Sequence, residues 1–186
     1  MAKRSSSRPS SKEVEATRKY LSQADVPGHS LAQALRVPQA IADNYGKNPT
    51  KPLRVAEALD MSPGSSHFRV LTGAAIAYGL TDGGYNSELI SLTVLGRRIV
   101  APTRGGDDFA AKREAMLRPR VIRDFLTRYN ESRLPAENIA RNVLEELGVP
   151  ENRTAQVFSL IVEAARELGF LREVKGQLYV ELDGAS

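Results

Sequence analysis

The residues of this chain that could support catalysis or metal binding are few and poorly spaced. His29 and His67 have no second histidine or close carboxylate at ligand spacing, and there is no cysteine, so a zinc site is not expected. Neither a P-loop nor a G-x-G-x-x-G pattern occurs. The acid pairs 107–108 and 145–146 are sequence neighbours, which point in different directions on a helix and make poor acid/base dyads. The sequence therefore predicts a protein that is not an enzyme and that binds no metal or cofactor.

Other residues are suited to contacting nucleic acid. In helix-turn-helix proteins the last of three helices enters the major groove, and its N-terminal residues reach base edges. Serine, threonine and arginine are suitable reader types. Phosphate neutralisation usually supplies most of the affinity, yet Arg69 is the only permanent cation from Ser62 to Asp82. The candidate DNA-contacting residues of this first reading helix are Ser65, Ser66, His67, Arg69 and Thr72. For His67 the alternative is a polar residue on a helix surface.

A second set of candidate contacts lies nearer the C-terminus and beside the hairpins. The second reading helix also carries glutamates, and the most basic ordered stretch, residues 118–128, lies on a first helix rather than a reading one. The alternative for those arginines is pairing with neighbouring acids, such as Arg120 with Asp124 at i,i+4. The further candidates are Arg97 and Arg98 after the first hairpin, Arg153, Thr154 and Gln156 on the second helix, and Arg172 and Lys175 at the second hairpin.

Two stretches must position these residues, Ser62–Pro102 and a shorter echo at Pro150–Glu181. Each runs through a proline-led apolar helix, a glycine exit, and a strand, tight turn and strand, which is how a winged helix-turn-helix unit ends. In the first stretch, Ser62 is expected to cap a helix over Pro63–Tyr78 with proline at its first position. Thr93 is expected to cap a short helix over Val94–Val100.

The remaining elements follow from capping and proline signals. Ser30 and Gln33 form a capping-box pattern before a helix that Pro38 re-starts or kinks. Further helices are predicted over Lys12–Gln23, Leu53–Leu59, Phe109–Leu117, from Pro119 to Tyr129, from Pro135 to Gly148, and over Ala155–Leu168. A hairpin that turns at Lys175-Gly176 closes the chain.

The two stretches also match in sequence. Phe68–Gly79 superposes on Phe158–Gly169 without gaps at a constant offset of 90 residues, which indicates a repeated supersecondary unit. Chance similarity of two amphipathic helices is the alternative. The predicted fold class is mainly α with small β-hairpins, arranged as two tandem winged helix-turn-helix units. We predict a disordered basic tail over residues 1–12, a first unit over 13–104 and a second over 105–186.

Charge is distributed unevenly along the chain. Residues 1–12 carry four basic groups and no acid, and residues 13–186 carry 22 of each sign, so the folded part is neutral. The tail either keeps the protein soluble or binds phosphates as a loose arm. No apolar run approaches the 18 residues of a membrane span, and the N-terminus lacks a secretory signal, so a cytoplasmic location is expected.

With these residues in view, the chain resembles an uncharacterised bacterial tandem winged-helix module, over roughly Val14–Leu182. The resemblance is carried by residues 26–38, 78–85 and 92–100, and in the second half by 140–148 and the Gly169-Phe-Leu exit. In longer relatives this module precedes a TIR-like nucleotide-binding domain of antiphage defence proteins. The resemblance implies no catalytic domain within this chain.

Two functions from different classes follow. One is a DNA-binding or regulatory winged-helix module acting on double-stranded DNA, as in transcription regulation. The alternative is a protein–protein interaction or sensing module that controls a TIR-like effector in antiviral defence. The small-residue run over 73–77 fits close helix approach, across a homodimer or inside the unit.

Overall fold

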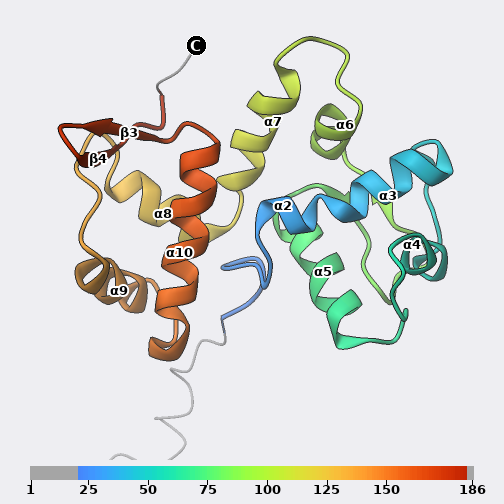
Figure 1. The fold of residues 1–186 in the computed structure, drawn as a ribbon. Helices are drawn as coiled ribbons and strands as arrows, with labels where there is room; N and C mark the ends of the chain where they lie inside the picture. The colour runs from blue at the N-terminus through green and yellow to red at the C-terminus, as the bar shows by residue number, and fades with distance from the viewer. Residues whose placement is uncertain (1–20, 184–186) are drawn as a thin grey trace, which may run out of the picture.

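The computed structural model describes residues 21–183. The predicted basic tail and most of the helix predicted over Lys12–Gln23 lie outside these residues, and residues 21–23 are not helical. The described chain is mainly helical with two small antiparallel sheets, which confirms the predicted class (Figure 1). None of the described helices is long and apolar enough to cross a membrane.

We call residues 21–104 the first half and residues 105–183 the second half. The first half contains α2 (Leu31–Ala34), α3 (Arg36–Tyr45), α4 (Pro52–Ala58), α5 (Ser66–Ala77), β1 (Thr81–Asp82), β2 (Ser91–Leu92) and α6 (Val94–Val100). The second half contains α7 (Asp107–Met116), α8 (Arg120–Arg128), α9 (Glu137–Glu146), α10 (Glu151–Glu167), β3 (Leu171–Val174) and β4 (Gln177–Val180).

Two helices of the first half begin where the capping signals predict. At α2 the Gln33 backbone N–H donates to Ser30 Oγ, and the Ser30 N–H donates to Gln33 Oε1, so the capping box is complete. At α6 the Gly96 N–H donates to Thr93 Oγ1. An interruption near Pro38 is also confirmed. The helix α2 ends at Ala34, whose carbonyl a proline four residues later cannot bond, and α3 begins at Arg36, two residues before Pro38.

The start predicted for α5 is wrong. The helix begins at Ser66 rather than Pro63, and Ser65, not Ser62, is its N-cap. Ser65 Oγ accepts the Phe68 N–H and donates to the Ser62 carbonyl, so one hydroxyl both caps the helix and closes the preceding turn. In the second half α9 begins two residues after Pro135, and α10 begins directly after Pro150, four residues earlier than predicted.

Both halves have the same order of elements. Each has two helices, a segment that bridges to the second strand of the hairpin or the residue before it, two more helices and the antiparallel hairpin, and the first half adds α6 after its hairpin. The bridges are Thr50 with Ile90 in the first half, and Asn130 with Val180 and Arg133 with Tyr179 in the second. The second hairpin turns at Lys175 and Gly176, both with positive φ, as its sequence predicts.

The sequence repeat corresponds to equivalent positions in the two halves. Leu71 and Ile161 are both fully buried, as are Ala75 and Ala165. Gly79 and Gly169 end α5 and α10 with φ of 73° and 69°, a left-handed conformation that favours glycine. The 90-residue offset therefore relates two helices that share these buried positions and the same exit.

The hydrophobic core crosses the predicted boundary between the units. The larger cluster joins Tyr78 and Leu80 of the first half to Phe125 and Ile161 of the second. A smaller cluster around Phe68 lies within the first half. In Figure 1, α6 and α7 lie side by side where the two halves meet.

Residues 22–26 strap the first half to the start of α8. The carbonyls of Ala24 and Asp25 accept the N–H groups of Arg120 and Val121 at 3.2 and 3.0 Å, which satisfies donors that a helix start leaves free. The Asp25 carboxylate accepts Arg120 Nε at 2.6 Å and is also bonded by Ser22. The Arg120 hydrogen bond, helped by Ser22, lowers the pKa of Asp25 to about 2. Arg120 is thus held mainly by Asp25 rather than by Asp124, which is 3.8 Å away.

Candidate nucleic-acid interface

The first turn of α5 presents the polar side chains predicted to reach base edges. Ser66 and His67 are exposed, while the Ser65 hydroxyl is occupied as the helix cap. The His67 ring lies 5.4 Å from the ring of His29, which follows the strap. This turn therefore offers one free hydroxyl and one imidazole to a ligand.

Arg69 joins α5 to the loop between β1 and β2. Its guanidinium lies 5.9 Å from the centre of the Tyr85 ring at the tip of that loop. Arg69 is exposed and forms no ion pair with a carboxylate in the described part of the chain. Its charge is available to an anionic partner.

Thr72 does not belong to this surface. The residue is 1% exposed, and its hydroxyl donates to the carbonyls of Phe68 and Arg69 within the same helix. The prediction failed because Thr72 falls on the buried side of α5, one residue after Leu71. It supports the packing of α5 and cannot contact a base.

A second group of cations lies beside the first half's sheet, and the sequence analysis did not single out its two lysines. Arg97 of α6 donates from Nη2 to the Lys47 carbonyl at 3.4 Å, and Lys51 precedes α4. The bridge between Thr50 and Ile90 holds this loop against the hairpin. All three cations are exposed. The sequence signal for them is the absence of any acid between residues 44 and 56.

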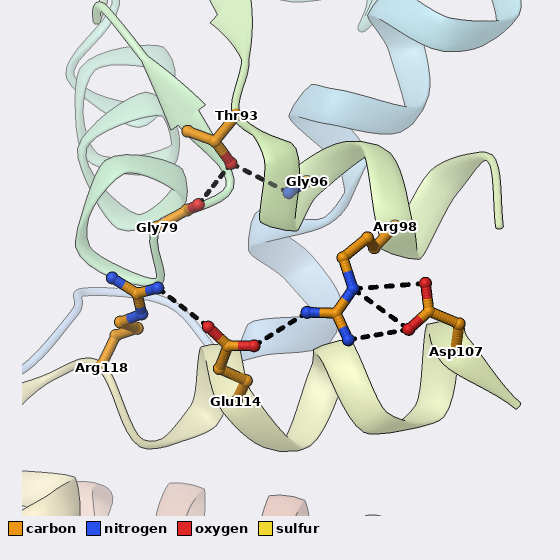
Figure 2. Close-up of polar contacts among 7 residues, drawn as sticks. All are labelled: Gly79, Thr93, Gly96, Arg98, Asp107, Glu114 and Arg118. Carbon is orange, nitrogen blue, oxygen red and sulfur yellow. Dashed lines mark hydrogen bonds and ion pairs between the residues drawn. The ribbon is translucent and has the colours of Figure 1, made fainter. Parts of the chain in front are cut away.

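Arg98 has a structural role instead. Its guanidinium donates to both oxygens of Asp107 and to Glu114, and Glu114 also accepts Arg118 Nη2 at 3.0 Å (Figure 2). Arg98 lowers the pKa of Asp107, and Arg118 and then Arg98 lower that of Glu114. These pairs link α6 to α7, so the predicted DNA contact at Arg98 is not supported.

The same close-up shows why α6 and the end of α5 lie so near each other. The Thr93 hydroxyl donates to the Gly79 carbonyl at 2.6 Å while capping α6 (Figure 2). A side chain on Gly96 would overlap the Leu80 carbonyl oxygen, so only glycine permits this approach. The hairpin, α5 and α6 are therefore fixed relative to one another.

The outer face of α10 differs from that of α5. Gln156 is exposed and Arg153 is half-buried, but Thr154 is fully buried, accepting from Arg141 and donating to the Glu151 carbonyl. Its prediction as a base reader fails for the same reason as that of Thr72. Further along, α10 faces the first half across a groove of about 270 Å³. Residues lining this groove include Leu31 and Leu35 of the first half, Lys112 of α7, and Leu160, Glu163 and Glu167 of α10.

The second hairpin retains one of its two predicted cations. Arg172 forms an ion pair with Glu181 at 2.8 Å, whereas Lys175 is exposed at the turn. Arg113, on α7, donates to the carbonyls of Leu168 and Leu182 and stacks 4.1 Å from the Phe170 ring centre. Two of these three cations are thus occupied in holding the second half together.

Within residues 21–183, no group of three or more histidine, cysteine or acidic side chains is arranged to hold a metal ion. The sequence matches no family model, and no curated protein or solved structure is significantly similar to it.

Proposed function

We propose that this chain is a non-enzymatic, cytoplasmic DNA-binding regulator built from two winged helix-turn-helix units, of which the first contacts the duplex. The repeated order of two helices, bridging segment, two helices and hairpin supports this reading of the fold. In it the three-helix sets are α3 to α5 and α8 to α10, so α5 and α10 are the third helices of the two units, and the hairpins are their wings.

The observation that carries the proposal is the difference in available positive charge. The first half has eight basic and six acidic residues, a net of +2, and the second has twelve and fourteen, a net of −2. Because phosphate contacts dominate affinity for DNA, the duplex is drawn to the first half and repelled by the second. The exposed cations of the first half that form no ion pair in the described chain include Arg69, Lys47, Lys51 and Arg97.

The first turn of α5 supplies the groups for base contacts. Ser66 and His67 project from the helix start, and Arg69 and Tyr85 connect that helix to the wing. Lys47, Lys51 and Arg97 would neutralise phosphates of the flanking backbone, since they lie beside the same hairpin. Phosphate contacts, including one from Arg69, would position the protein, and Ser66 and His67 would add base preference.

The experiment is fluorescence-anisotropy binding of a mixed-sequence duplex across a salt series. In wild type, the logarithm of the association constant should fall linearly with the logarithm of salt concentration. Arg69→Ala should weaken binding about tenfold and reduce the salt slope by about 1, as expected for one lost phosphate contact. Replacing Lys47 and Lys51 together by alanine should reduce the slope by about 2.

The matched control is Arg166→Ala. Arg166 is an exposed arginine on α10, at the position equivalent to Ile76 on α5 by the 90-residue offset. Its removal should leave DNA binding unchanged. Equal losses for Arg69→Ala and Arg166→Ala, or binding that vanishes in a chain starting at Glu13, would refute an interface on the first half.

A further inference from the structure

The outer face of α5 carries a groove that differs in chemistry from a row of cations that binds phosphates. Two hollows, of about 290 and 380 Å³, lie along this face and share Gln23, Gly73 and Ile76 in their walls. The first hollow extends to Arg69 and to the wing loop at Tyr85, and the second to Gly79 and Arg118. Together they form one groove along the helix, from the wing to the helix exit.

Gln23 crosses the groove at its middle. Its Oε1 accepts the Gly28 N–H at 3.2 Å, and its amide lies against Gly73, where any side chain would overlap it. The absence of a side chain at Gly73 therefore leaves room for a polar amide over the helix. This amide can hydrogen-bond to the backbone of a bound chain, as can the side chain of Asn86 in the first hollow.

Arginines stand at the two ends of the groove, and its middle is uncharged. Arg69 borders the first hollow, while Arg118 borders the second and packs beside Gly79. Gly79 follows Arg69 by ten residues, just past the end of α5, so at the helical rise per residue the two positions are about 15 Å apart. Arg118 uses one N–H group on Glu114, and its side chain is 53% exposed, so other donors remain.

Apolar side chains occupy the space between the arginines. Ile76 is 45% exposed and Tyr85 is 39% exposed, and Ala77 lines the wall beside Ile76. A DNA strand would place about four phosphates along 15 Å, with no cation between the ends to meet them. A protein segment with an apolar centre and acidic ends matches this surface better.

We infer that this groove docks an acidic, extended segment of a partner protein. Its two carboxylates would pair with Arg69 and Arg118, and a side chain such as leucine between them would cover Ile76. At about 3.3 Å per residue, the carboxylates stand four to five positions apart. Docking by itself does not depend on the proposed DNA binding. Where both occur, partner and duplex exclude each other because they share Arg69.

The test is selection of a random dodecapeptide phage library on the full-length chain, with Ile76→Ser as the counter-selection target. Selected peptides should carry two acidic residues four or five apart with an apolar residue between them. As synthetic fluorescent peptides, they should bind at least tenfold more weakly to Ile76→Ser, Arg69→Ala and Arg118→Ala than to wild type. Arg166→Ala should bind like wild type. Thermal melting of each variant checks that the exposed substitutions leave the fold intact.

Ile76→Ser separates this inference from DNA binding, because it removes an apolar side chain without changing charge. It should lose the peptides and keep wild-type affinity for the duplex. Peptides that bind Ile76→Ser as well as wild type, or a selection that enriches nothing over the counter-selection, would overturn the inference. Duplex binding without peptide binding would also overturn it while leaving the proposed function standing.

Discussion

The helices α5 and α10 occupy equivalent places in the two halves, yet their outer faces have opposite character. On α5 this face carries Arg69, which forms no ion pair within residues 21–183, together with small residues and an exposed isoleucine beside an open groove. On α10 it carries Glu163 and Glu167 and faces the first half across the groove between the halves. The inner faces, by contrast, both bury aligned pairs such as Leu71 with Ile161 and Ala75 with Ala165.

This contrast separates packing from function. Leu71 and Ile161 are buried in both halves because each belongs to a hydrophobic core cluster. The outer faces are free of that constraint, so their differences identify what each half contacts. On this reading the first half contacts the ligand, whereas the outer face of α10 lines the groove against the first half.

The largest expected effect concerns the inner faces that the halves share. Leu71→Ala and Ile161→Ala should each lower the free energy of unfolding by about 2–5 kcal/mol, because both side chains are fully buried. Urea unfolding followed by far-UV circular dichroism should show a single transition for both variants, since the larger core cluster spans the two halves. A second transition that Leu71→Ala leaves unmoved would show that the halves unfold independently.

The strap at Asp25 tests whether the halves depend on each other. Asp25→Asn should cost about 1.5–3 kcal/mol at pH 7, toward the lower end because the side chain is a quarter exposed. The folded pKa of about 2 lies below the ordinary value of 3.8. The contribution of Asp25 is therefore complete above pH 4 and is lost as pH falls toward 2.

Unfolding free energies at several pH values between 2 and 7 measure this dependence. Wild type and Asp25→Asn should differ at neutral pH, and the difference should shrink as pH falls through the folded pKa of about 2. Asp124→Asn is the matched control, because Asp124 lies 3.8 Å from the same arginine, and its effect should be smaller. A difference between wild type and Asp25→Asn that persists unchanged at pH 2 would contradict the assignment to the ionised carboxylate.

Local capping and turn signals predicted much of the fold. The capping box at Ser30, the cap at Thr93 and the turn at Lys175 depend on neighbouring residues alone, so their patterns were sufficient. The sequence offers two serines as possible caps of α5. Ser65 is the cap because its hydroxyl accepts the Phe68 N–H and also donates to the Ser62 carbonyl.

The candidate site was harder to predict because it depends on contacts between distant segments. Arg98 was predicted from its place after a hairpin, but its partners Asp107 and Glu114 come from the next helix. Sequence spacing suggested an ion pair between Arg120 and Asp124, four residues away. The short contact of Arg120 is instead with Asp25, 95 residues earlier. The groove on α5 needs Gln23 to lie over Gly73, and helix periodicity gives no sign of such a contact.

The two threonines that were predicted to read bases provide a smaller test. Thr154→Val should cost about 1 kcal/mol, because Arg141 loses its hydrogen-bond acceptor next to a buried position. Thr72→Val should cost less than about 0.5 kcal/mol, since its hydroxyl only adds a bond to carbonyls of its own helix. Neither change should alter DNA affinity. A tenfold loss of DNA affinity in either folded variant would show that the threonine contributes to the DNA interface.

The smallest expected effect is at the second hairpin, β3–β4. Lys175 is an exposed cation at a hairpin turn, so its local surroundings alone would predict a stronger contact with DNA than that of Arg69. Nevertheless, Lys175→Ala should change duplex affinity by less than about twofold, because the half around it has a net charge of −2 and repels phosphate. Anisotropy titrations of Lys175→Ala and Arg69→Ala at one low salt concentration compare the two halves directly. A loss at Lys175 as large as that at Arg69 would mean that both units contact DNA, and the contrast between α5 and α10 would then concern packing alone.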